Sequence, residues 1–338
     1  MNRKSFSLAA LSLLTIAIAS CTADEDIRTL ETGAADNNAI VFSVENAAAE
    51  RSASTRDMST SVTDFKVSAL DRGSEYFSTP MSVFSTGSNW TSTDKTYWPT
   101  DRALTFVAFV DSNPNGNSFE IADGAASFAD YEVPSNVADQ SDLMYAVAKD
   151  VSKGTSNGSV SLRFRHSLAQ VSFTAQNNSP VYESIEILSV ELGGVKGNGT
   201  YTFPQGSTNA GSKGEWKIAE NASDRSFTID NLSVTLGACG SSCNGEKVSI
   251  SSASRAESGN VMYMIPQEAG EDAYIKVKSR KTLKDVPGAS YESEDIIPIS
   301  GEWKEGQRYN YNIAWNATPI TFNVKVADFR EVSASIND

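Results

Sequence analysis

Two alternating stretches near the end of the sequence decide the fold: YNYNIAW at 309–315 and ITFNVKV at 320–326. In both, large apolar or aromatic residues occupy every second position, and the positions between hold polar residues or, at 314, an alanine. A period of two places all the apolar side chains on one face of an extended chain, which predicts two half-buried strands. Thr318-Pro319 between them predicts a turn.

The same signal recurs along most of the chain. Short alternating or apolar runs predict strands at 40–44, 62–70, 81–84, 104–110, 160–164, 171–175, 185–192, 227–232, 248–250, 261–265, 274–278 and 296–299. The run at 104–110 is apolar on both faces, which predicts a central strand. No segment after residue 20 keeps a helical period, so we predict an all-β protein built from antiparallel β-sandwiches.

Turn formers predict where these strands are interrupted. The four residues at 177–180, Asn-Asn-Ser-Pro, divide the chain into an N-terminal domain at 40–176 and a C-terminal domain at 177–338. The alternation changes phase near Leu188, which predicts a β-bulge. Glycines at 193, 194, 197 and 199 predict a hairpin or long loop over 193–203.

The N-terminus carries an export signal. Arg3 and Lys4 precede an apolar run at 6–19 that is too short to cross a bilayer as a helix, and Ile-Ala-Ser-Cys follows at 18–21. This order resembles a bacterial lipoprotein lipobox, which implies a signal peptide at 1–20, a lipidated Cys21 and a tether at 21–39. The acidic residues at 24–26 resemble a surface-export signal of Bacteroidetes lipoproteins. The alternatives are a secreted protein cleaved nearby and an ordinary acidic linker.

Composition limits the partners. The 338-residue chain has a net charge of -14, which argues against nucleic acid or an anionic membrane surface as a partner. Besides Cys21, the cysteines are Cys239 and Cys243, separated by a glycine-serine turn. In an exported protein these two residues are a possible disulfide, provided that the turn brings their Cα atoms within range.

Motifs for catalysis or metal binding are incomplete. Residues 206–213 approach a phosphate-binding loop, but the lysine comes one position late and no apolar helix follows. Residues 111–122 begin like a calcium loop but end in Ala122 where a glutamate is required. His166 is the single histidine and has no recognisable nucleophile or acid partner in the sequence. We therefore expect no catalytic residues, no metal, no cofactor and no enzyme activity.

Five stretches resemble the fimbrillin family of Bacteroidetes surface pili. They are YWP at 97–99 with the run at 104–110, SDLMYA at 141–146, LRFRHSLAQV at 162–171, YMIPQ at 263–267, and Trp303 with residues 306–313. The resemblance extends from the lipobox to the C-terminus. It implies two transthyretin-like β-sandwich domains in tandem, lipoprotein export, and assembly by strand exchange after an arginine- or lysine-directed protease removes the N-terminal segment.

The first and last strands share one pattern, I-x-F-x-V. The residues are Ile40, Phe42 and Val44 in the first, and Ile320, Phe322 and Val324, followed by Val326, in the last. If the shared pattern is functional, the first strand fills a groove that the last strand of another copy later occupies. The alternative is that any two sandwich strands can share such a pattern.

Arginines follow the first strand in the sequence. Arg51 and Arg56 lie in a small-residue connection where a cut by an arginine-specific protease would release that strand, whereas Arg28 precedes it. We therefore predict a pilin with a candidate donor strand at 320–327 and a role in adhesion. Its partners would be other pilin subunits in a head-to-tail filament and, through the lipid, the outer membrane, which places it in surface fimbriae. The alternative is a non-polymerising surface lipoprotein that binds glycans or proteins through aromatics such as Trp90 or Trp216.

Overall fold

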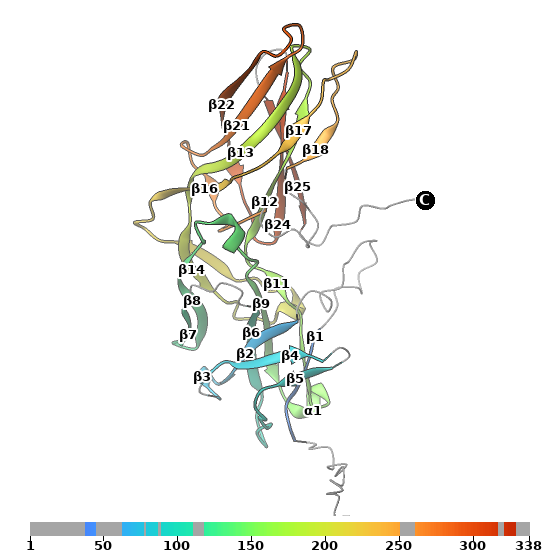
Figure 1. Cartoon of the computed structure of the whole chain (residues 1–338). Helices are drawn as coiled ribbons and strands as arrows, with labels where there is room; N and C mark the ends of the chain where they lie inside the picture. The colour runs from blue at the N-terminus through green and yellow to red at the C-terminus, as the bar shows by residue number, and fades with distance from the viewer. Residues whose placement is uncertain are drawn as a thin grey trace, which may run out of the picture. The chain divides into compact units, whose positions relative to one another are not determined.

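The structure is a computed structural model that describes residues 38–44, 63–77, 79–86, 89–110, 118–250, 261–316 and 321–328 (Figure 1). The chain divides into two units, Met1–Asn37 and Asn38–Asp338, and every described element lies in the second unit. The regular secondary structure of the described part is almost entirely β-strand, which confirms the predicted all-β class. Its helices are all too short to span a membrane.

One large sheet is formed by early strands of the chain. Its strands are β2 (Asp64–Asp71), β3 (Ser74–Glu75), β4 (Met81–Ser85), β5 (Trp90–Ser92), β6 (Leu104–Val110), β9 (Met144–Val151) and β11 (Arg165–His166). The order is β11-β9-β6-β2-β4-β5, with β3 beside β2, and all pairs are antiparallel. β6 is an interior strand, as its doubly apolar sequence predicted.

A second sheet joins strands from distant parts of the sequence. Its members are β7 (Ser118–Ala122), β8 (Ala125–Glu132), β14 (Asn198–Thr202) and β15 (Glu215–Ile218), in the antiparallel order β15-β14-β8-β7.

Two further sheets contain most of the later strands. The first consists of β13 (Tyr182–Lys196), β16 (Asp224–Ile229), β17 (Val234–Leu236), β21 (Tyr274–Leu283) and β22 (Ser290–Pro298). The second consists of β12 (Ala169–Asn177), β18 (Lys247–Ser249), β19 (Met262–Met264), β24 (Gln307–Trp315) and β25 (Thr321–Asp328). Their orders are β16-β13-β21-β22 and β18-β12-β24-β25, and β12 runs parallel to β24 while β25 is antiparallel to it.

The remaining elements are short. β1 (Val41–Val44) pairs with β10 (Ser159–Leu162), and β20 (Glu268–Ala269) pairs with β23 (Gly301–Glu302). The helical turns are η3 (Val137–Asp139), α1 (Lys153–Ser156) and η4 (Thr208–Ala210). α1 lies in a stretch whose turn formers include Ser152, and a capping box between Ser152 and Thr155 stabilises its single turn.

The division into domains at residue 177 stays a prediction. β12 precedes that position and lies in the same sheet as β24, whereas β14 and β15 follow it and lie in the same sheet as β8. One hydrophobic cluster accordingly contains residues from both predicted domains, such as Phe128 and Tyr311.

The predicted bulge is confirmed, whereas the predicted glycine-rich loop is not. The pairing of β13 with β21 shifts between Ile187 and Ser189, which confirms the predicted bulge. The prediction of a hairpin or loop over 193–203 is wrong, because β13 continues through Lys196 and β14 follows at once. At position 193 the strand needs a residue without a Cβ, because the ring of Tyr274 occupies the space that a Cβ would take.

A buried ion pair lies among the strands of the C-terminal half. Lys281 Nζ lies 2.8 Å from Asp295 Oδ2, and the indole Nε1 of Trp315 donates to the same oxygen at 3.2 Å. The Lys281 side chain is only 5% exposed, so its charge depends on this carboxylate for compensation.

A second polar cluster connects β9, β14 and the turn before β24. The hydroxyl of Tyr145 donates to Glu305 Oε1, and that of Tyr201 donates to the same oxygen at 3.4 Å. Burial raises the pKa of the Glu305 carboxyl above its ordinary value, although the two tyrosine hydroxyls act in the opposite direction.

Candidate functional site

Strand β1 places an apolar row inside the protein. Ile40 and Phe42 are buried in a hydrophobic cluster, Val44 packs against it half-buried, and Val41, which points the other way, is exposed. The alternation of the sequence thus corresponds to one buried and one exposed face. Of the residues that the sequence singled out for the first strand, all three face the core.

Aromatic rings line the groove that holds β1. The Phe42 ring makes edge-to-face contacts with Phe65 and Phe106, with centroids 6.2 and 5.9 Å apart. Phe65 also packs on Trp90 at 5.1 Å and on Phe164 at 5.2 Å. Such contacts add to the free energy of burying the rings. Phe42 is therefore the largest side chain by which β1 enters the core.

Backbone hydrogen bonds hold the same segment on both flanks. On one side β1 runs parallel to β10, with Phe42 opposite Val160. On the other side the Ile40 N–H donates to Thr96 O at 2.8 Å, and the Trp98 N–H donates to Asn38 O at 3.0 Å. In the described part of the chain β10 has no strand partner other than β1, so loss of β1 would open a sheet edge.

Strand β25 has the opposite character. It is an edge strand whose single described neighbour is β24, and Val324 and Val326 are 38% and 52% exposed. In the antiparallel register these valines lie opposite Tyr311 and Tyr309, which are buried. Directly opposed residues share a face of the sheet. β25 thus extends the apolar face of β24 to the sheet edge, where it is poorly covered.

Several predicted site residues lie outside the described part of the chain. They are Cys21, Arg51, Arg56 and Ile320, and for Phe322 only the backbone is described, opposite Ile313. The predicted lipidation and processing sites therefore stay predictions, as does the role of the donor strand.

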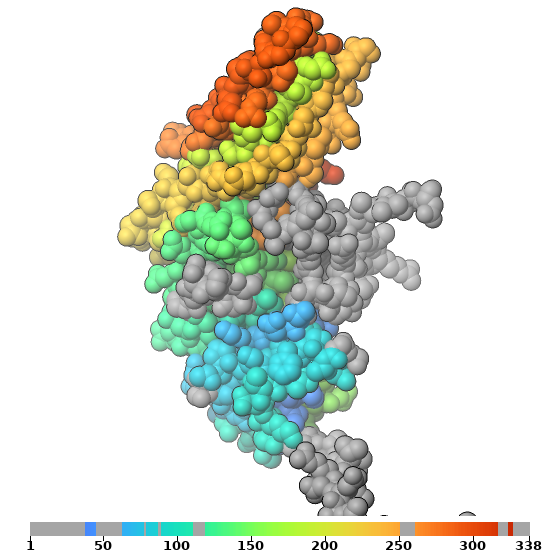
Figure 2. Space-filling view, viewed as in Figure 1, coloured from blue at the N-terminus to red at the C-terminus, as the bar shows by residue number. Residues whose placement is uncertain are grey.

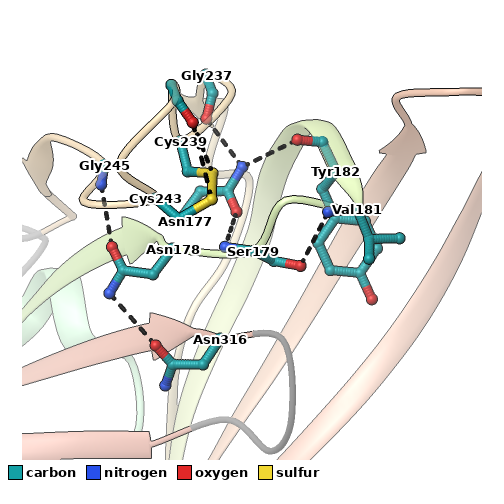
Figure 3. Close-up of a disulfide and its surroundings, with 11 residues drawn as sticks. Asn177, Asn178, Ser179, Val181, Tyr182, Gly237, Cys239, Cys243, Gly245 and Asn316 are labelled. Atoms are coloured by element: carbon teal, nitrogen blue, oxygen red, sulfur yellow. Dashed lines mark hydrogen bonds between the residues drawn. A yellow bond between two sulfur atoms is a disulfide. The ribbon is translucent and has the colours of Figure 1, made fainter.

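The two remaining cysteines lie near the end of β12 (Figure 3). A disulfide joins Cys239 and Cys243, whose Cα atoms are 4.4 Å apart. The residues that flank the bridged segment contact the end of β12: Asn177 Nδ2 donates to Gly237 O at 2.9 Å, and the Gly245 N–H donates to Asn178 Oδ1 at 3.0 Å. Asn178 in turn donates from Nδ2 to Asn316 Oδ1 at 3.4 Å.

The side chains proposed for ligand binding or chemistry have structural contacts. Trp90 packs on the groove residue Phe65, and the indole of Trp216 donates to Ser167 O at 2.7 Å while its ring packs on Tyr201. His166 Nδ1 contacts the carboxylate of Asp142. Within the described ranges, no cluster of three or more His, Cys, Asp or Glu residues could hold a metal ion.

Sequence reasoning missed most of the residues that line the groove. Phe106 and Phe164 lie in predicted strands, but the sequence does not indicate that both face β1. Trp98, whose indole donates to Gly158 O at 3.4 Å, belongs to the stretch at 97–99 that carried part of the family resemblance. The family resemblance of that stretch was the one signal in the sequence that could have pointed to a residue of the groove.

Comparison with known proteins identifies the family. The sequence model described as fimbrillin-like matches residues 28–328. No curated protein sequence matches the chain significantly. Among solved structures, a fimbrial protein from Bacteroides vulgatus has 16% identity and a TM-score of 0.62, with 87% of this chain and all of that chain covered, and it shares the fold.

Candidate cell adhesion proteins are also similar. That from Bacteroides uniformis has 14% identity and a TM-score of 0.47, over 86% of this chain and 97% of its own. That from Parabacteroides distasonis has 11% identity and a TM-score of 0.49, over 86% and 95%. Fimbrillins are structural proteins rather than enzymes, which confirms the expectation that this chain is not an enzyme. The extent of the family match, over most of the chain, shows that this protein belongs to the fimbrillin-like family.

Proposed function

We propose that this chain is a structural subunit of cell-surface fimbriae with a role in adhesion. It is exported as a lipoprotein through Cys21 and polymerised by protease-triggered donor-strand exchange. Membership of the fimbrillin-like family and a fold shared with a fimbrial protein support the fimbrial role. The observation that carries the mechanism is the complementarity of two strands: β1 fills an aromatic groove, and β25, whose Val324 and Val326 are exposed at a sheet edge, belongs to a stretch with the same I-x-F-x-V pattern in its sequence.

Burial of β1 explains why exchange needs a cut. Burying Ile40, Phe42 and Val44 contributes on the order of 5 to 8 kcal/mol before entropy and strain. A strand tethered to its own groove also competes at an effective concentration of about millimolar or more, so a strand from another molecule cannot displace it readily. Cleavage after Arg51 or Arg56 removes this advantage, because β1 can then dissociate.

The vacated groove accepts the last strand of another copy. Ile320, Phe322 and Val324 take the places of Ile40, Phe42 and Val44, and the freed edge of β10 offers backbone partners. The contact is head-to-tail and does not close on itself, so repetition produces a filament. The lipid brings to the surface a subunit whose groove is still filled by β1. A subunit that is not cleaved stays attached to the outer membrane.

Phe322→Asp tests the exchange step. The variant is expected to stay a folded monomer after processing and to form no ladder of oligomers on gels, because a carboxylate cannot enter an aromatic groove. Lys325→Asp in the same strand is the matched control, since Lys325 is exposed and lies on the opposite face of the strand from Phe322. Ladders of normal intensity from Phe322→Asp would refute strand exchange.

The processing site is tested separately. Replacement of both Arg51 and Arg56 by Ala is expected to leave the N-terminal strand attached and to abolish ladders. Mass spectrometry of the mature N-terminus measures this directly. A normal product that starts near Asp57 in the double variant would contradict the assignment.

A further inference from the structure

The chain is firmly held at the point where β24 ends. The Asn178 N–H donates to Trp315 O at 2.7 Å, and the Asn178 side chain donates to Asn316 Oδ1, as Figure 3 shows. The Trp315 indole also donates to Asp295. None of these contacts involves β25, so they persist when β25 leaves β24. Asn316 is therefore the fixed point from which a donated strand departs.

The distance from this fixed point to the donated residues is short. If exchange occurs as proposed above, Ile320 takes the place of Ile40 in the next subunit. Four residues span at most about 14 Å when fully extended. The beginning of the acceptor groove must consequently lie within about 14 Å of Asn316 of the donor. The surface around Asn316 has to lie against the acceptor subunit.

An exposed apolar surface lies next to Asn316. We call Val181, Val286 and Tyr291 the end patch; each is 45% to 52% exposed. Val181 follows Asn178 by three residues, and its carbonyl accepts from the Lys284 N–H at 2.9 Å, which brings the β21–β22 connection alongside. The hydroxyl of Tyr291 lies 3.2 Å from that of Tyr182. Figure 2 shows the β21–β22 hairpin, in orange, as an outer surface of the molecule.

The beginning of the groove also carries an exposed aromatic residue. Ala39 forms an antiparallel bridge with Tyr97, and Ile40 donates to Thr96 O. Tyr97 is 43% exposed although its carbonyl is held by the Tyr76 hydroxyl at 2.9 Å. This side chain is therefore at the rim that the donor reaches first.

We propose that the end patch of one subunit docks on the Tyr97 rim of the next subunit, as a second interface beside the exchanged strand. The occupant is a second copy of this chain. Isolated exposed apolar residues need no explanation, but these are grouped at the one point that the short connection forces against a neighbour. The docking fixes the angle between successive subunits, which a single inserted strand does not.

Val286→Asp tests the docking against Ile296→Asp as the matched control. Both residues are exposed and both lie in the β21–β22 hairpin, but Ile296 is five residues from Tyr291, about 17 Å along β22. Both processed monomers are expected to unfold at the same denaturant concentration as the wild type. Val286→Asp is expected to lower the yield of polymer about tenfold, whereas Ile296→Asp leaves it unchanged. Equal yields from the two variants would overturn the proposal.

A photo-crosslink identifies the contact directly. Benzoylphenylalanine is placed at position 286, and the polymers that form are irradiated. Position 286 of one subunit is expected to become crosslinked to the peptide that contains Tyr97 of the neighbouring subunit. Polymers that form without this crosslinked peptide would overturn the docking while leaving strand exchange standing. Absence of any polymer from processed wild-type protein would overturn both.

Discussion

Truncation of Phe42 measures how strongly the first strand occupies its groove. Phe42 is buried and contacts Phe65 and Phe106, so Phe42→Ala leaves a cavity among aromatic rings. Such substitutions cost about 3 to 5 kcal/mol. If β1 separates from its groove before the rest unfolds, most of this loss increases the population of the open groove. A loss of about 3 kcal/mol raises that population on the order of 100-fold.

Two assays distinguish local from global effects. Urea unfolding of the uncut protein measures the total loss of stability, and cleavage of β1 by a protease of broad specificity reports opening of the groove. Val41→Ala is the matched control, because Val41 is the adjacent residue and faces solvent; its expected cost is about 0.5 kcal/mol or less. If Phe42→Ala lowered the free energy of unfolding no more than Val41→Ala does, the apolar face of β1 would not be what holds it in the groove.

Three further predictions concern the body of the protein. Asp295→Asn is expected to cost about 3 to 5 kcal/mol in urea unfolding, because it leaves the buried Lys281 ammonium unpaired, whereas Lys281→Met should cost clearly less. The raised pKa of Glu305 means that its contribution to stability is fully present below the ordinary carboxyl pKa and is lost as the pH rises through the raised value; the free energy of unfolding relative to Glu305→Gln should therefore fall as the pH rises above the ordinary carboxyl range, and a flat difference would contradict this. Reduction of the Cys239–Cys243 disulfide should cost about 2 kcal/mol, since the bond closes a very short loop, and a Cys239→Ser and Cys243→Ser double variant should be insensitive to reductant.

The alternation of apolar residues predicted which residues face the core. It placed Ile40 and Phe42 on the buried face of the first strand and Tyr309 and Tyr311 on that of β24, and the structure agrees. Periodicity indicates a face because successive side chains of a strand point in opposite directions. The change of phase at Leu188 likewise indicated a real bulge.

The partners of the strands could not be predicted in the same way. β12 and β24 are parallel neighbours although most of the C-terminal sequence separates them, and β14 crosses to the sheet of β8. A period of two contains no information about which strand lies alongside. The stretch at 193–203 was misjudged because glycine usually marks turns, whereas here the ring of Tyr274 takes the space beside Gly193.

The candidate site was predictable only in part. The shared I-x-F-x-V pattern singled out the two strands, but not the groove, whose walls come from β2, β6 and the residues after β10. The exposure of Val324 and Val326 depends on the edge position of β25, which is a property of sheet order. Sheet order becomes visible only in three dimensions.

Disulfide trapping in the polymer tests strand exchange most directly. Ser43 lies opposite Ser161 of β10, and Asn323 holds the equivalent position in the last strand. In a polymer of the Ser161→Cys, Asn323→Cys double variant, oxidation is therefore expected to join successive subunits into a ladder that resists heat and collapses on reduction. Thr321→Cys in place of Asn323→Cys reports insertion in the opposite direction. Polymers that form with neither crosslink would contradict the account.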